Sequence, residues 1–170
     1  MAATVTWYNS MTGTPAWQSS AAFGGVLYFH TSDSNASDFT NPLVKPSSGN
    51  AYSFEKACKL VVTGISGGQL SSLQVLIGGT VPTNTSILAA WDDLYKAPQL
   101  ANTVGAYVSS SSTVLSTTPT NWLDEGIATA DITANTDPWG DFIWLAMQVA
   151  STATAGSYSG FQVIARYNEI

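Results

Sequence analysis

The chain has 170 residues, of which 45% are hydrophobic and 9% are charged, and its formal net charge at pH 7 is −6. This length fits one ordinary domain, which can fold without disulfides or a structural metal. The acidic balance excludes a nucleic-acid surface and an anionic-membrane surface, because both need clustered basic residues. The basic residues are scattered instead, at Lys45, Lys56, Lys59, Lys96 and Arg166.

The low charge also bears on the class of protein. A soluble domain has about 25% charged residues, whereas this surface must consist largely of Ser, Thr, Gly, Ala and Asn. That composition favours a component of an assembly over a free cytosolic enzyme. The start of the chain lacks the basic and apolar regions of a signal peptide, and no apolar run approaches the ~20 residues of a membrane span. We therefore expect assembly in the cytoplasm.

The first 50 residues predict two strands and a long loop. Residues 4–8 alternate Thr with Val and Trp, which is typical of a strand, and residues 26–31 predict a second one. Residues 32–50 are rich in Asp, Asn, Pro, Ser and Gly, which predicts a loop. Within a single domain of residues 1–170, residues 1–50 are expected to form a partly extended N-terminal arm and loop region.

The middle of the chain contains the clearest strand pattern. Residues 52–63 alternate between a mostly apolar and a mostly polar face, which predicts a half-buried antiparallel strand. Lys56 interrupts the apolar face, and we expect it to mark where the strand leaves the core. Residues 73–77 predict the next strand. Residues 80–102 are irregular, and we expect a short helical turn at residues 88–94.

The last third predicts four more strands. They cover residues 104–108, 127–132, 142–149 and 161–167. The third is apolar on both faces, which indicates a central strand. Roughly eight short strands with turns between them and little helix predict an all-β fold, specifically an antiparallel, jelly-roll-like β-sandwich.

The sequence predicts no catalytic, cofactor or metal site. His30 is the only histidine, and Cys58, the only cysteine, lies on the apolar face of its strand, where a buried thiol is inert. Two aspartates, Asp33 and Asp38, together with Asn35 suggest a calcium loop but lack the glycine and glutamate of an EF-hand. Asp137 and Asp141 flank a turn and are a second pair of side chains whose oxygen atoms could bind a metal ion.

Two pairs of neighbouring carboxylates leave open the alternative that the protein is a glycan hydrolase. Asp92 with Asp93 follows Trp91, and Asp124 with Glu125 follows Trp122. A glycosidase needs two carboxylates on either side of a sugar bond. However, adjacent residues on a strand point to opposite faces, and loop carboxylates are usually only solvated.

Aromatic side chains are the main candidates for a binding surface. Large rings in loops are enriched at interfaces, because they bury much area and keep a polar group. The alternative is that each ring closes an open end of the fold. The candidate interface residues are Trp7, Trp17, Trp91, Tyr95, Trp122 and Trp139.

Residues 52–169 resemble virion structural proteins of tailed bacteriophages. The resemblance rests on YSFEKACKLVVTG (52–64), LQVLIG (73–78), YKAP (95–98), NWL (121–123), DFIWL (141–145) and the closing GFQVIARYNE (160–169). It implies a β-sandwich on the phage particle, of the capsid decoration or cement type. These motifs are patterns of strands and turns, so no functional residue is carried over.

The resemblance and the composition lead to one expected function and one alternative. The first is a non-enzymatic decoration protein on the capsid surface of the virion, which binds the major capsid protein and forms a homo-oligomer. Residues 1–50, with Trp7 and Trp17, are then expected to supply much of the contact. The alternative is a carbohydrate-binding module of a fibre or tail, in which Trp91, Tyr95, Trp122 and Trp139 are exposed platforms.

Overall fold

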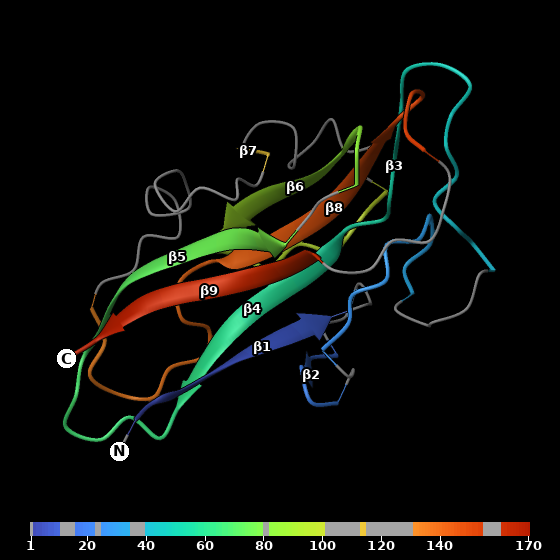
Figure 1. The fold of residues 1–170 in the computed structure, drawn as a ribbon. Coiled ribbons are helices and arrows are strands. Elements are labelled where there is room, and N and C mark those ends of the chain that lie inside the picture. The colour runs from blue at the N-terminus through green and yellow to red at the C-terminus, as the bar shows by residue number, and fades with distance from the viewer. Residues whose placement is uncertain are drawn as a thin grey trace.

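The computed structural model describes residues 2–10, 16–22, 25–34, 40–79, 82–100, 113–114, 131–154 and 161–170. These ranges contain strands and no helix, and the strands form antiparallel sheets, so the predicted all-β fold is confirmed (Figure 1). The finer prediction, a jelly-roll-like sandwich, stays a prediction. The strands are β1 (Thr4–Ser10), β2 (Gln18–Ser19), β3 (Asn50–Tyr52), β4 (Lys56–Thr63), β5 (Leu70–Gly79), β6 (Thr85–Asp92), β7 (Thr113–Val114), β8 (Phe142–Ala150) and β9 (Phe161–Glu169).

The larger sheet has the strand order β2-β1-β4-β8-β6-β7, and β3 pairs with β8 as well. β8 therefore lies between β4 and β6, as its two apolar faces predict. Its residues from Ile143 to Ala146 are all buried. A strand buried on both faces has no need of polar alternation, which explains why its sequence is nearly continuous in hydrophobic residues.

The smaller sheet consists of β5 and β9, which run side by side across the larger sheet (Figure 1). Their pairing extends from Leu70 opposite Glu169 to Gly79 opposite Phe161, with an irregularity between Ser71 and Gln74. Ser72 lies at this irregularity with a φ of 54°, a conformation that a serine rarely adopts.

One hydrophobic core joins the two sheets. Side chains from β4, β6 and β8 meet side chains from β5, and Trp139 joins them from the segment before β8. Burying one such large apolar side chain stabilises the fold by about 1.5–3 kcal/mol. The buried core residues are Cys58, Leu60, Val62, Leu70, Leu73, Val75, Ile87, Ala89, Trp139, Ile143 and Leu145.

β4 is buried on both faces, so the prediction of a half-buried strand over residues 52–63 is wrong in that respect. Its pairing with β8 also shifts by one residue between Tyr52 and Lys56, which divides the predicted strand into β3 and β4. In the gap, Glu55 is buried and accepts a hydrogen bond from the backbone N–H of Gln99 (3.0 Å). This contact fixes residues 93–100 against the sheet.

β1 pairs with β4 along its whole length, from Thr4 opposite Thr63 to Ser10 opposite Ala57. The predicted N-terminal arm is therefore wrong for residues 4–10, which belong to the sheet. The backbone N–H of Ala3 donates a hydrogen bond to Oε1 of Glu169 (2.8 Å), and the two termini lie at the same end of the molecule (Figure 1).

Two other local predictions are wrong. Residues 26–29 form no strand, although Leu27 and Phe29 pack partly against the core, and His30 only makes an isolated bridge with Pro42. Residues 88–94 form no helical turn, because Leu88 to Asp92 belong to β6. Of the remaining predicted strands, residues 104–108 lie outside the described residues, as do residues 127–130.

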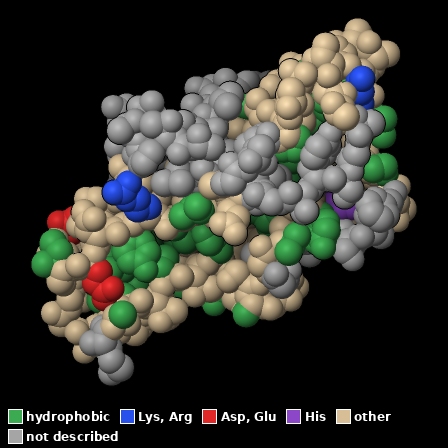
Figure 2. All heavy atoms as spheres, viewed as in Figure 1, with side chains coloured by type: hydrophobic (Ala, Val, Ile, Leu, Met, Phe, Trp, Pro, Cys, Tyr) green, Lys and Arg blue, Asp and Glu red, His purple; other side chains and the backbone are tan. Residues whose placement is uncertain are grey.

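Charged side chains are sparse on the face that Figure 2 shows, where polar groups, backbone and several hydrophobic patches cover most of the described surface. This agrees with the 9% of charged residues in the chain. No helix among the described residues is long and apolar enough to cross a membrane.

Candidate functional site

The outer face of the larger sheet, which is turned away from β5 and β9, carries the candidate site. Tyr8 of β1 lies opposite Lys59 of β4, and Asp92 of β6 lies opposite Phe142 of β8. Opposed side chains of antiparallel strands share a face, and Trp144 shares the face of Phe142 because side chains alternate along a strand. Neighbours of these residues, Leu60 and Ile143 among them, point the other way into the core.

Trp17, Tyr95, Phe142 and Trp144 form what we call the outer-face aromatic cluster. The ring of Trp17 is stacked on Phe142, with 5.7 Å between centroids and an interplanar angle of 18°. Tyr95 meets Trp17 and Phe142 edge-on at 5.5 and 5.7 Å. Trp144 is buried, whereas the other three rings are half-buried. Edge-to-face and offset pairs of this kind each contribute about 0.5–1.5 kcal/mol.

Tyr95 is held over the sheet by contacts at the end of β6. The backbone N–H of Leu94 donates to Oδ1 of Asp92 (2.9 Å), and the ammonium of Lys96 pairs with the other carboxylate oxygen. The indole N–H of Trp144 donates to the backbone carbonyl of Lys96 (3.0 Å). Tyr95 is thus enclosed in a short turn that is fixed on both sides.

Trp17 is held from the side of β1. The backbone N–H of Ala16 donates to Oγ of Ser10 (3.1 Å), and that of Ser20 donates to the carbonyl of Trp7 (2.8 Å). Burial raises the pKa of the Tyr95 hydroxyl, and a hydrogen bond with the Ser10 side chain opposes this rise. Ser10 therefore links the two segments that cover the outer face.

Lys59 lies beneath Trp17 and is only 8% exposed. Its ammonium is 4.7 Å from the centroid of the Trp17 ring and 5.8 Å from that of Tyr8. It also forms an ion pair of 2.6 Å with Asp137. An almost buried ammonium needs such compensation, because removing it from water is costly unless it is paired.

Four aspartates, namely Asp92, Asp93, Asp137 and Asp141, accompany the cluster. The contact with Lys96 holds the pKa of Asp92 below its ordinary value. Burial raises the pKa of Asp141, and the negative charges of Asp93 and Asp92 raise it further. Three carboxylates thus lie close enough to one another at the ends of β6 and β8 to interact electrostatically.

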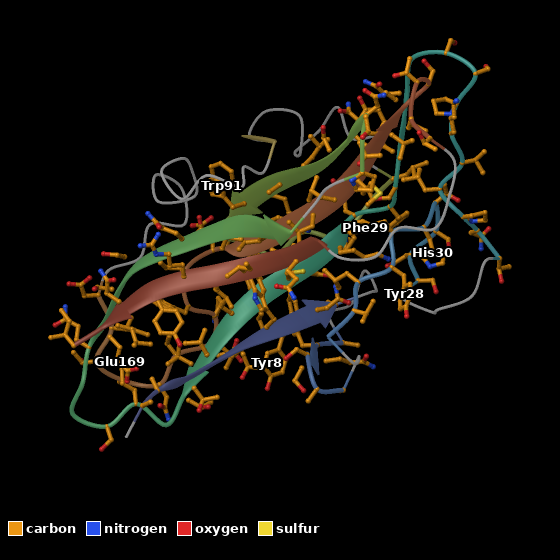
Figure 3. All side chains as sticks on the ribbon, in the orientation of Figure 1. Tyr8, Tyr28, Phe29, His30, Trp91 and Glu169 are labelled. Carbon is orange, nitrogen blue, oxygen red and sulfur yellow. The ribbon has the colours of Figure 1, made fainter. Side chains whose placement is uncertain are left out.

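Lys56, at the start of β4, is fully buried, so the prediction that the strand leaves the core there is wrong. Its ammonium donates a hydrogen bond to the carbonyl of Ser34. Burial lowers the pKa of Lys56 from its ordinary value of 10.5 to about 8, although the nearby negative charge of Asp33 acts in the opposite direction. Burial raises the pKa of Asp33 in turn. This buried lysine fixes residues 31–34, which follow His30 at the end of the sheet where β1 ends (Figure 3).

The structure places the predicted interface residues in different environments. Trp17 and Tyr95 belong to the outer-face aromatic cluster. Trp7 and Trp91 point inward and pack partly against the core. Trp139 is 1% exposed and packs edge-on against Tyr167, so its prediction as an interface residue is wrong. It fills the core beside β9, to which Tyr167 belongs. Trp122 lies outside the described residues.

The residues weighed for catalysis and metal binding are dispersed. Cys58 is buried, and burial raises the pKa of its thiol to about 12, so it is a neutral thiol at physiological pH. His30 is buried, and its ring centroid lies 6.3 Å from that of Tyr28 (Figure 3). In the ranges that the structure describes, no group of three or more His, Cys, Asp and Glu side chains is placed to hold a metal. Asn35, Asp38, Asp124 and Glu125 lie outside these ranges.

Three members of the site were not identified from the sequence: Lys59, Phe142 and Trp144. Their strand patterns were visible, but the outer face forms only when β1, β4, β6 and β8 are placed in register. The usable signal was the sequence DFIW, in which aromatic residues two apart follow an aspartate and so share one face of a strand.

Comparisons of the chain with protein-family models, with curated proteins and with solved structures find no match.

Proposed function

We propose that this protein is a virion structural protein, a capsid decoration protein that binds the major capsid protein and stabilises the shell without catalysing a reaction. Three features support the proposal. Residues 52–169 resemble such proteins, the chain has only 9% charged residues, and the fold is all-β, as the resemblance implies. The jelly-roll-like topology, the homo-oligomeric state and the capsid location belong to the same proposal.

The observation that carries the proposal is the outer-face aromatic cluster. Trp17, Tyr95 and Phe142 are half-buried rings held in place by hydrogen bonds and by one another. Charged groups, among them Asp93 and Asp137, lie exposed beside them. An apolar aromatic centre with a charged rim is the usual composition of a protein–protein interface.

The carbohydrate-binding alternative receives less support from the described rings. Sugar platforms are flat, exposed ring faces, whereas Trp139 is in the core. Trp91 packs partly against the core as well. The hydrolase alternative also receives no support. Asp92 forms an ion pair with Lys96, and the second carboxylate pair, Asp124 with Glu125, lies outside the described residues.

The test is quantitative mass spectrometry of purified particles from the source phage, with the copy number expressed relative to the major shell protein. A copy number of the same order as that of the shell protein is the expected result. A handful of copies per particle would place the protein in the neck, tail or fibre, and its absence from particles would reject a virion role altogether.

A further inference from the structure

We infer that the outer-face aromatic cluster and the aspartates beside it form a docking surface for arginine and lysine side chains of the partner protein. This inference rests on the proposed function and deepens it, because it states the chemistry of the partner surface. It concerns one face of the larger sheet, at the ends of β6 and β8.

This face carries more negative than positive side chains. Four carboxylates, those of Asp92, Asp93, Asp137 and Asp141, accompany two ammonium groups, those of Lys59 and Lys96. The printed sequence has five Lys and Arg in all, and every one lies in the described residues. Within these residues the ion pairs engage Asp137 and Asp92, so neither Asp93 nor Asp141 is paired with a cation.

The carboxylates of Asp92, Asp93 and Asp141 repel one another. The charges of Asp93 and Asp92, in addition to burial, raise the pKa of Asp141. A cation placed among these three groups would be attracted to all of them and would relieve their repulsion. A partner of the same negative charge would be repelled, so the face discriminates in favour of a basic partner.

The aromatic rings also favour a cationic ligand. Trp17 already has the ammonium of Lys59 at 4.7 Å from its ring centroid, so this cluster binds a cation within the molecule. Planar guanidinium groups stack on aromatic rings and pair with carboxylates at the same time. Half-buried rings beside unpaired aspartates therefore fit arginine better than they fit an uncharged apolar anchor.

The experiment uses the full chain and two synthetic heptapeptides as probes, one alternating glycine with arginine and the other alternating glycine with glutamine. Binding is followed by the ¹H–¹⁵N resonances of the tryptophan indoles, with that of Trp17 identified from Trp17→Phe. The arginine peptide is expected to bind saturably and to shift the Trp17 resonance. The double variant Asp93→Asn/Asp141→Asn is expected to bind it roughly tenfold more weakly at low ionic strength.

Asp131→Asn is the control, because Asp131 is an exposed aspartate that contacts Gln69, the residue before β5 of the smaller sheet. It loses one charge of the same kind and is expected to bind the arginine peptide as the unmodified protein does. Melting temperatures of all variants show whether they are folded. Equal binding of the two peptides, or of the double variant and the control, would overturn the inference.

Binding to shells that lack this protein separates the inference from the proposed function. If the unmodified protein sediments with shells and the double variant does so equally well, the inference fails while the proposed function stands. If the arginine peptide binds but shells do not, the proposed function fails and the docking chemistry stands. A neutral oligosaccharide that shifts the Trp17 resonance when the arginine peptide does not would overturn the inference in favour of a glycan ligand.

Discussion

Lys56 shows how one residue can carry an energetic cost that a sequence pattern does not reveal. Its position on the apolar face of residues 52–63 was evident, but a lysine there was expected at the end of the core. Instead the side chain is buried and reaches the carbonyl of Ser34. A buried ammonium with a lowered pKa destabilises the folded state at neutral pH relative to a well-packed apolar side chain.

The first prediction concerns Lys56→Met. The folded-state pKa of about 8 lies below the ordinary value of 10.5, so between these values the unfolded chain binds more protons than the folded protein. Lys56 therefore contributes stability that is complete above about pH 10.5 and is lost as the pH falls through about 8. The shift corresponds to about 3 kcal/mol. We expect Lys56→Met to be more stable than the unmodified protein by about 1–3 kcal/mol at pH 7 and to lose most of this advantage at pH 10.

Denaturant unfolding at pH 7, 8, 9 and 10 measures this difference. Lys45→Met is the control, because Lys45 is exposed, and its effect should not change with pH. The groups near Lys56, namely Asp33 and Cys58, are common to both proteins and largely cancel in the comparison. A stability difference for Lys56→Met that is the same at pH 7 and pH 10 would contradict this account.

Trp139 and Trp17 form a second pair of residues whose roles the sequence could not distinguish. Both follow turn-rich segments, yet Trp139 is 1% exposed in the core and Trp17 is half-buried on the outer face. Trp139→Ala is expected to lower the free energy of unfolding by about 3–5 kcal/mol, because it leaves a large cavity. Trp17→Ala is expected to cost less, about 1–3 kcal/mol, because the ring is only half-buried but loses its contacts with Tyr95 and Phe142. Denaturant titrations of both variants measure this contrast, and equal losses would refute the division into core and surface rings.

At the level of elements, β1 is an internal part of the larger sheet. It pairs with β4 over seven residues, and Val5 and Trp7 pack against the core. Deleting residues 2–10 would therefore remove both backbone pairing and core contacts, and it would turn β4 into an edge strand. An arm that only orders on docking would behave differently, because its loss would leave the fold intact.

The third prediction follows from this difference. The chain without residues 2–10 is expected to lose its cooperative thermal unfolding transition and to aggregate, as measured by circular dichroism and size-exclusion chromatography. The control removes only residues 2 and 3, which leaves β1 complete and removes the contact between Ala3 and Glu169. A cooperative transition near that of the full chain in the longer deletion would restore the arm hypothesis.

Several elements followed from local pattern, and several did not. The alternation in β1 and β9 and the apolar run in β8 predicted these strands correctly, because each reports which faces of a strand are buried. The register shift that divides β3 from β4 was not predictable, since it depends on the partner strand β8. Residues 26–29 alternate as a strand does and pack Leu27 and Phe29 against the core, yet they pair with no other strand. Alternation indicates which side chains are buried and does not indicate backbone pairing.

For the whole molecule, the class of fold was predictable and the site was not. Composition and alternation are properties of the chain, and they were sufficient for an all-β fold with little helix. The outer-face aromatic cluster joins residues 17, 95, 142 and 144, which are far apart in the sequence and meet only through sheet register. Of the predicted interface residues, Trp17 and Tyr95 lie there, whereas Trp139 was assigned to a surface because turn residues surround it.

We propose that this protein binds the phage shell and stabilises it. The most direct test uses shells that lack this protein. The temperature at which these shells open is measured while increasing amounts of the purified protein are added back. We expect the opening temperature to rise with added protein and to saturate at a fixed ratio to the shell protein. An opening temperature that does not change at any ratio would contradict the claim.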